Sequence, residues 1–205
     1  TLPVKFPLLL QQGAEGIAVG LACKMLPHNF IELIDGAVAY LKGRSFKLLP
    51  DFPAGGEADC EQYNDGLRGG RVRVRAKIRK EDNKTLVVEE LPYGVTTTSL
   101  IESILKANDK GKIKVKRVED NTAEFVEVMI HLAAGVSPDR TIDALFAFTD
   151  CEVRIAPNAC VIENDRPVFL GVKEILKRSA DRTRMLLGRE LEIRLGELQE
   201  AWHFA

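Results

Sequence analysis

The sequence predicts an α+β fold: a ferredoxin-like unit followed by a long C-terminal helix. Strand-like and helix-like patterns alternate in the order β-α-β-β-α-β from residue 85 to residue 156, which is the order of a split βαβ unit. From Gly171 onward the pattern is helical, with leucines at three- and four-residue spacing toward the C-terminal end. That stripe indicates a core-facing helix or the start of a coiled coil.

The individual elements follow from local periodicity and from turn residues. Asn29 is a good N-cap for a helix that ends near Gly43, and Ser137 followed by Pro138 begins a later helix. Two helices are expected in the second half of the chain, at 98–110 and 137–149. Strands are expected at 85–91, 112–116, 125–132, 152–156 and 159–163. We therefore expect three consecutive segments, 1–84, 85–164 and 165–205, with the ferredoxin-like unit in the middle.

Composition excludes several classes of protein. The chain has 205 residues, a net charge of −1, and 45% hydrophobic residues, as in a globular protein. Its four cysteines form no C-x-x-C pair and lie near no histidine at finger-like spacing, so we expect no metal site and a reducing, cytoplasmic location. No run of 18 apolar residues is present, so we expect no membrane partner.

One stretch concentrates positive charge. From Arg71 to Arg79 every odd position is basic and every even position is aliphatic, which is the period of a β-strand. Such a strand has one face for a core and one face of like charges, which repel one another unless a polyanion lies along them. A solvated edge strand is the alternative, but edge strands usually mix charges of both signs. The pattern favours phosphate binding.

A glycine-rich stretch lies near the N-terminal end. Residues 13–20 read Gly-Ala-Glu-Gly-Ile-Ala-Val-Gly, so the backbone can turn tightly and approach a ligand closely. The stretch lacks both the Gly-Lys-Ser/Thr ending of a P-loop and the G-x-G-x-x-G spacing. Nucleotide binding is therefore not expected here.

Five motifs occur in a specific order and together carry a family resemblance. They are Gly-Ile-Ala-Val-Gly (16–20), Pro-His-Asn (27–29), Pro-Asp-Phe-Pro-Ala-Gly-Gly (50–56), Gly-Leu-Arg-Gly-Gly-Arg-Val (66–72) and Glu-Leu-Pro-Tyr (90–93). The whole chain resembles the breakage–reunion (A) subunit of bacterial type IIA DNA topoisomerases. Residues 22–29 depart from the gyrase form, which favours the topoisomerase IV branch.

The resemblance implies a function for the parent protein. Enzymes of this family are ATP-dependent isomerases that cut one duplex, pass another through it and reseal the break. The catalytic tyrosine follows an arginine, whereas Tyr40, Tyr63 and Tyr93 of this chain do not. The chain therefore resembles the tower (shoulder) region and the start of the coiled coil, and we expect it to lack catalytic residues and cleavage activity.

Cofactors and partners are also implied by the resemblance. No cofactor is expected in this chain, because Mg²⁺ and ATP belong to a partner, the topoisomerase B subunit. The other expected partners are double-stranded DNA and a second copy of the A subunit in the full-length homodimer, with the isolated piece a monomer. The location implied is the bacterial cytoplasm, in association with the chromosome.

The resemblance gives roles to eight residues. Ile17 would wedge between base pairs and kink the cut duplex, and Lys24, His28 and Asn29 would flank it against phosphates. An anion at the helix N-terminus next to His28 fits the same reading, although a turn histidine in solvent fits the spacing as well. The arms of the bent duplex would be held by Arg68, Arg71, Arg73 and Arg75.

Two other functions are compatible with parts of the pattern. A stand-alone nucleic-acid-binding module would need exposed aromatic residues on its central strands, and Phe125 alone gives thin support. A metabolic enzyme with a ferredoxin-like regulatory domain would need convergent titratable residues, which the sequence does not indicate.

Overall fold

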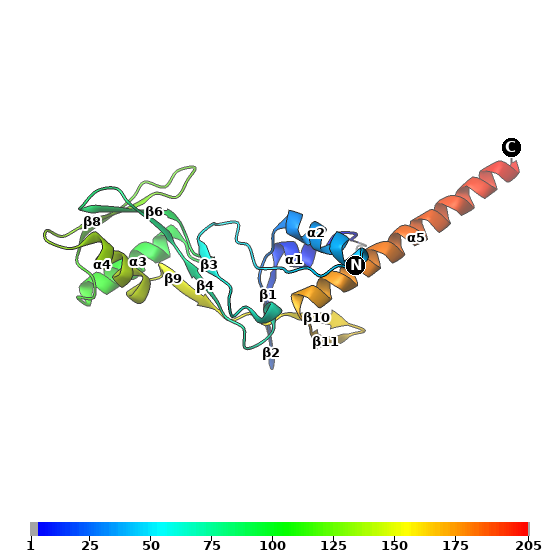
Figure 1. Ribbon diagram of the computed structural model, residues 1–205, viewed down its shortest axis with the longest axis horizontal. Coiled ribbons are helices and arrows are strands. Elements are labelled where there is room, and N and C mark those ends of the chain that lie inside the picture. Colours follow the sequence, from blue (N-terminus) through cyan, green and yellow to red (C-terminus); the bar gives the residue numbers. More distant parts are fainter. Residues whose placement is uncertain (1–3, 205) are drawn as a thin grey trace. The chain divides into compact units, whose positions relative to one another are not determined.

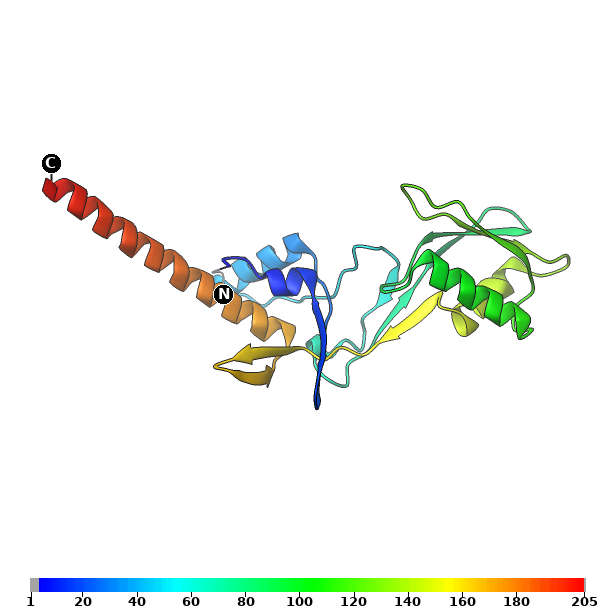
Figure 2. The ribbon, with the colours of Figure 1, turned by 180° about the vertical axis from the view of Figure 1, so that it is seen from behind.

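The computed structural model describes residues 4–204 as a mixed α/β chain (Figures 1 and 2). Over these residues the strands form four small sheets, of two, two, three and four strands. The chain ends in one long helix, α5 (Val172–Phe204), which confirms the expected C-terminal helix. No helix in this range combines the length and the apolar character needed to cross a membrane.

The chain divides into two compact units, each built from separated segments. The first unit comprises residues 1–51, 63–70 and 157–205, and the second comprises 52–62 and 71–156. The three consecutive segments expected from the sequence follow the order of the chain and remain an expectation, whereas the packing groups residues that are distant in sequence.

The first unit packs helices beside two β-hairpins. Its elements are α1 (Leu8–Gln12), β1 (Ala14–Ala18), β2 (Leu21–Met25), α2 (Phe30–Leu41), the 3₁₀ turn η1 (Asn64–Gly66), β10 (Cys160–Glu163), β11 (Arg166–Phe169) and α5. Strands β1 and β2 pair with each other, as do β10 and β11. Leu10, Leu26, Leu33 and Leu176 are fully buried and form the core that fixes these elements.

The second unit contains the two larger sheets and two helices. Its elements are β3 (Glu57–Asp59), β4 (Val72–Arg75), β5 (Lys77–Lys80), β6 (Thr85–Glu90), α3 (Thr97–Asp109), β7 (Val115–Asp120), β8 (Val128–Leu132), α4 (Pro138–Phe148) and β9 (Glu152–Ile155). Side chains from β6, β8, α3 and α4 build one hydrophobic core, including Leu86, Leu100, Ile104, Ile130 and Leu145. The expected helices at 98–110 and 137–149 are confirmed to within one or two residues.

The order of the four-stranded sheet differs from the expected ferredoxin-like unit. The order is β5-β6-β8-β7, whereas a split βαβ unit would place the last strand of the pattern, β9, beside β6. Strand β9 instead pairs with β4 in the three-stranded sheet, and β5 occupies the position beside β6. Strand β5 pairs with the edge of β6 that β9 would otherwise occupy. The two strands are joined by a four-residue turn, so they are close in sequence and their pairing is local.

The basic strand is not one continuous strand. It is interrupted at Ala76, and its two halves, β4 and β5, belong to different sheets. The buried Ala76 donates its backbone N–H to the carbonyl oxygen of Cys151 at 2.8 Å, outside both ladders. The alternation itself is confirmed in β4, where Val72 and Val74 are completely buried and Arg73 is exposed.

Gly69 and Gly70 provide a test of the turn that precedes β4. A Cβ at residue 70 would lie 2.3 Å from the carbonyl oxygen of Tyr63, whereas one at residue 69 would meet nothing within 4 Å. Gly69 has φ of +91°, so alanine there causes only backbone strain, about 1–2 kcal/mol. We expect Gly70→Ala to lower the midpoint of urea unfolding more than Gly69→Ala does. Equal midpoints for the two variants would contradict this packing.

Candidate nucleic-acid interface

The hairpin β1–β2 presents apolar side chains to solvent. Ile17 faces Ala22 across the hairpin, and Val19 and Gly20 form its two-residue turn, in which Gly20 has φ of +76°. The exposed fractions are 90% for Ile17 and 106% for Val19. Leaving a large aliphatic side chain in water forgoes about 1.5–3 kcal/mol of burial. Two of them at one tip indicate a surface that meets a partner.

The base of this hairpin is fixed by Asn158. Lys24 and Asn158 exchange two backbone hydrogen bonds, of 3.0 and 2.9 Å. The Asn158 amide also donates to the carbonyl oxygen of Ala22, the residue opposite Ile17. These bonds come from a segment more than 130 residues away in sequence, so Asn158 is a positioning residue for the tip. The sequence analysis did not identify it.

Lys24 lies on the hairpin as expected, but its charge is already partly compensated. Its Nζ is 2.9 Å from Oε1 of Glu15, the facing residue on β1. The pair is partly exposed, and such pairs contribute about 0–1 kcal/mol. The ammonium could therefore exchange this carboxylate for a phosphate at small cost.

The structure places His28 in the core, which differs from the expected phosphate contact. The side chain is 3% exposed. Its Nδ1 is 3.2 Å from the carbonyl oxygen of Leu10, which can only accept, so Nδ1 carries the proton. Its Nε2 is 3.2 Å from the hydroxyl oxygen of Tyr63 and accepts from it. With both nitrogens engaged inside the protein, His28 is removed from the candidate interface.

Asn29 is the N-cap of α2, as the sequence predicts. Its Oδ1 accepts from the backbone N–H groups of Ile31 and Glu32, and its Nδ2 donates to Asp51 at 3.0 Å. These bonds use its amide for local structure. Because the neighbouring Asp51 is anionic, the immediate surroundings do not favour a phosphate at Asn29.

Arg68 lies in the exposed glycine-rich turn of the first unit. Its side chain is exposed and makes no ion pair with any residue that the structure describes. The Nδ2 atom of Asn64 lies 3.5 Å from its backbone carbonyl oxygen. Arg68 therefore offers a free guanidinium on a turn defined by its glycines.

The second unit carries the remaining arginines, Arg71 just before β4 and Arg73 and Arg75 on it. Arg71 is exposed and, among the described residues, has no ion-pair partner. Arg73 is exposed and bonds Oδ2 of Asp59, on the neighbouring strand β3, at 2.8 Å. The Glu61 backbone N–H and then Arg73 hold the pKa of Asp59 below its usual range, so this carboxylate is ionised at neutral pH.

Arg75 is more strongly engaged than the other two. Its Nε donates to Oε2 of Glu152 at 2.8 Å, and its guanidinium lies 4.7 Å from the centre of the Phe146 ring. Burial disfavours ionisation of Glu152, but the ion pair with Arg75, then the charge of Arg73 and then the contact with Arg154 outweigh it and lower the pKa of that carboxyl. We therefore assign Arg75 mainly to holding β4 and β9 together.

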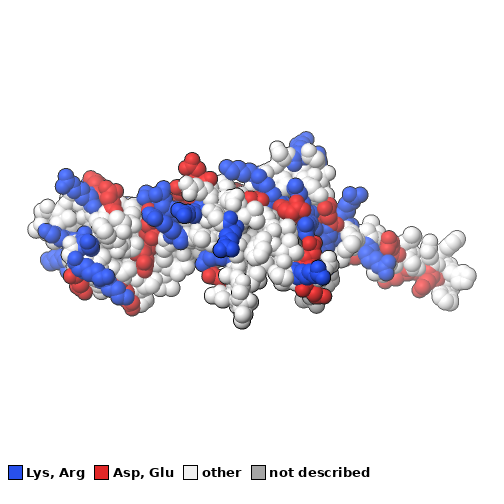
Figure 3. Space-filling view, turned by 90° about the horizontal axis from the view of Figure 1, so that it is seen from below, with Lys and Arg blue, Asp and Glu red and all other residues white. Residues whose placement is uncertain are grey.

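The rest of the basic alternation is paired with carboxylates. Lys77 lies 3.2 Å from Glu90, and Arg79 bonds both Glu89 and Glu81. In Figure 3, Lys and Arg occupy several parts of one face with acidic side chains between them. The row of uncompensated charges expected from the sequence is thus largely neutralised over β5, and Arg71 is its least compensated member.

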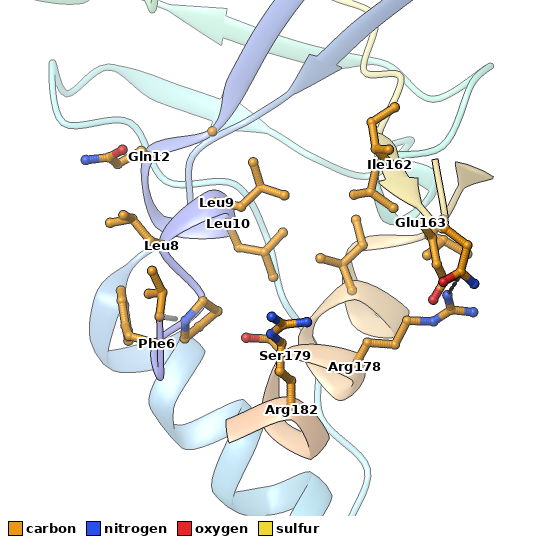
Figure 4. Close-up of a pocket in the computed structure, with 17 residues that line it drawn as sticks. Phe6, Leu8, Leu9, Leu10, Gln12, Ile162, Glu163, Arg178, Ser179 and Arg182 are labelled. Carbon is orange, nitrogen blue, oxygen red and sulfur yellow. Dashed lines mark hydrogen bonds and ion pairs between the residues drawn. The ribbon is translucent and has the colours of Figure 1, made fainter. Parts of the chain in front are cut away.

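A hollow of about 780 Å³ in the first unit is a separate feature (Figure 4). It lies between α1, the β10–β11 hairpin and α5, and most of its lining is apolar, including Leu9 and Ile162. Its lining includes three charged residues, Glu163, Arg178 and Arg182. Arg178 is bonded to Glu163 and to Glu174. This lining favours packing over catalysis, and the hollow contributes no reactive group to the candidate interface.

Comparison with known proteins identifies the family of this chain. The family model for DNA gyrase/topoisomerase IV, in its A subunit, matches residues 1–205. The chain belongs to the A-subunit family of DNA gyrase and topoisomerase IV. The sequence-based family assignment is confirmed, and the side chains described above are those of an A-subunit segment.

Three relatives show which branch is more similar. The chain is 43% identical to the A subunit of DNA topoisomerase 4 from Borreliella burgdorferi over 97% of its length, and 28% identical to the DNA gyrase A subunit of the same organism over 98%. It is 31% identical to the DNA gyrase A subunit of Brachyspira hyodysenteriae, also over 98%. The chain spans 31%, 27% and 26% of these relatives, respectively, less than a third of each.

The burial of His28 predicts that the stability of the fold depends on pH. Burial lowers its pKa below the ordinary value of 6.5, against the hydrogen bond to Leu10. Because the unfolded chain takes up the proton first, His28 stabilises the fold above about pH 6.5, and this contribution is lost as pH falls toward its lowered folded value. We expect the melting temperature to fall between about pH 7 and pH 5.5.

The matched comparison is His28→Gln against His203→Gln, since His203 is exposed on α5. His28→Gln should flatten the pH dependence of the melting temperature, and His203→Gln should leave it unchanged. An identical slope in wild type and His28→Gln would show that buried His28 does not control it.

Proposed function

We propose that this chain is the DNA-binding and DNA-bending part of the breakage–reunion subunit of an ATP-dependent type II topoisomerase. The observation that carries the proposal is the exposed Ile17 at the tip of a glycine-bounded hairpin. Family membership over the whole chain makes duplex DNA the partner to consider first. The relatives, which are named as A subunits of DNA topoisomerase 4 and of DNA gyrase, support the same choice.

The wedge role follows from the physics of an exposed aliphatic tip. Separating two stacked base pairs costs a few kcal/mol, and the bent duplex can then contact more protein. Insertion would remove the exposed surface of Ile17 from water, which offsets part of that cost. Asn158 would keep the tip of the hairpin in place while Ile17 is inserted, because its hydrogen bonds fix β2, the strand that faces Ile17.

Phosphate contacts would supply the remaining free energy. Bending a duplex site costs of order 1–6 kcal/mol. Arg68 on the glycine turn, Arg71 just before β4 and Arg73 on β4 are exposed, and Lys24 is held only by a partly exposed ion pair. These four residues are the proposed backbone contacts, two from each unit.

The two units would form the tower region of the parent protein. Helix α5 would begin a coiled coil, and the full-length A subunit would form a homodimer through contacts outside this chain. The stripe on α5 is exposed and suits such a partner helix: Leu187, Leu191, Leu195, Leu198 and Trp202. The B subunit would bind ATP and Mg²⁺, and the complex would act on the chromosome in the cytoplasm.

The surroundings of the three tyrosines support the proposal that this chain does not cleave DNA. Tyr63 is 3% exposed, the Tyr40 hydroxyl donates to Asp181 at 2.9 Å, and the Tyr93 ring lies 4.9 Å from that of Phe52. No residue of the described chain is therefore proposed to form the covalent link to DNA. We expect this chain to give no protein–DNA adduct when duplex and Mg²⁺ are added, with denaturing gels as the measurement.

The wedge is tested by Ile17→Ala in a bending experiment. Energy transfer between dyes at the two ends of a bound duplex should fall, because removal of the side chain leaves nothing to hold the base step open. Ile162→Ala is the matched control, since Ile162 is 70% exposed on the β10–β11 hairpin of the same unit. Unchanged energy transfer in Ile17→Ala would refute the wedge.

The phosphate contacts are tested by the salt dependence of duplex binding. Each phosphate that a cation neutralises adds about 0.9 to the slope of log affinity against log salt. Arg71→Ala should lower the slope by about one, whereas Arg79→Ala should change it little because two glutamates already bind Arg79. Binding that does not weaken with salt would contradict the proposed interface.

A further inference from the structure

We infer that Arg154, together with Arg71 and Arg73, forms a phosphate-binding cluster on the outer face of the β4–β9 pair. The inference rests on the proposed function, because it assumes that duplex DNA is the anion that this chain meets. It adds a residue that the sequence analysis missed, and it takes Arg75 out of the contact set.

The first observation is the strand register. Arg73 on β4 lies directly opposite Arg154 on β9. Residues directly opposite each other have Cβ atoms about 4.5–5.5 Å apart, and like charges in such a pair are destabilising. Asp59 compensates Arg73 in part, and Arg154 has only a long contact with Glu152. An anion bound between the two guanidinium groups would reduce the repulsion that remains, so the register favours an anionic ligand.

The second observation is the shape of the surface beside this pair. A pocket of about 320 Å³ is lined by Arg71, Arg73 and Arg154, with Asp59 and Glu61 at its side. All of these residues belong to the second unit, so the pocket does not depend on how the units are placed. Three guanidinium groups against two carboxylates leave a net positive lining.

The third observation concerns the existing partners of Arg154. Its side chain is 80% exposed, and its contact with Glu152 is long, at 3.5 Å between Nη2 and Oε1. Glu152 is held more closely by Arg75, at 2.8 Å. The guanidinium of Arg154 therefore keeps most of its donors free, in the planar arrangement that suits two phosphate oxygens.

The spacing of the cluster fits a chain of phosphates better than a single anion. Arg71 and Arg73 are two residues apart and line the same pocket. Two residues of an extended chain span about 6.6–6.8 Å. That separation is similar to the spacing of successive phosphates along one nucleic-acid strand. Arg154 lies across from Arg73, so two guanidinium groups can grip one phosphate while Arg71 contacts the next.

The test measures the affinity of the whole chain for a labelled duplex oligonucleotide at several salt concentrations. Arg154→Ala should weaken binding several-fold and reduce the salt slope by about one, as Arg71→Ala does. Arg194→Ala is the control, because it makes the same charge change on α5, where Arg194 pairs with Glu197. The effect of Arg194→Ala should be much smaller.

Stability provides a second readout. Removal of one of two facing like charges should leave the melting temperature of Arg154→Ala unchanged or raise it. Arg154→Gln, which keeps a long polar side chain without the charge, should lose the same salt slope, so a packing defect in the alanine variant would not hide the result.

The two levels of the proposal fail in different ways. If wild type binds with a steep salt slope that Arg71→Ala reduces, but Arg154→Ala and Arg154→Gln behave like Arg194→Ala, the Arg154 inference is wrong and DNA binding stands. If wild type shows no salt-dependent duplex binding, the proposed function itself is wrong.

Discussion

The period-two alternation that begins at Arg71 determines both the inside and the outside of the second unit. Val72 and Val74 are completely buried, and this burial forces the intervening Arg73 outward. The same strand pairs with β3 on one side and β9 on the other, so its neighbours decide which of its cations are neutralised. Asp59 binds Arg73, Glu152 binds Arg75, and Arg71 has neither partner within the described chain.

Sequence periodicity predicted the orientation of side chains better than it predicted their neighbours. The arginines of β4 and the helices at α3 and α4 follow from local spacing and capping residues. The pairing of β9 with β4 does not, because a period of two states which face a residue occupies and leaves the adjacent strand open. Arg154 was therefore predicted to lie on a strand, and only the register shows that it faces Arg73.

His28 and Ile17 illustrate the same limit at the candidate site. Both were assigned from the motifs around them, and the structure separates them: Ile17 is 90% exposed and His28 is 3% exposed. The burial of His28 depends on Leu10 and Tyr63, which lie 18 and 35 residues away. Contacts at that sequence distance leave no local signal. Ile17, by contrast, lies close to a two-residue turn, Val19–Gly20, that the positive φ of Gly20 permits, and this turn has a local signal in the sequence.

The discontinuity of the two units has a consequence for folding and for engineering. The chain passes between them after residues 51, 62, 70 and 156, so the N-terminal hairpin is anchored by Asn158 only after the whole second unit has been synthesised. Such long-range closure is slow compared with local pairing. Neither unit corresponds to one continuous stretch, so a simple truncation cannot release either one intact. The turn between β5 and β6 joins two strands of the same unit, but its Lys84 carbonyl oxygen accepts from the Leu132 N–H, so an insertion there must leave Lys84 in place.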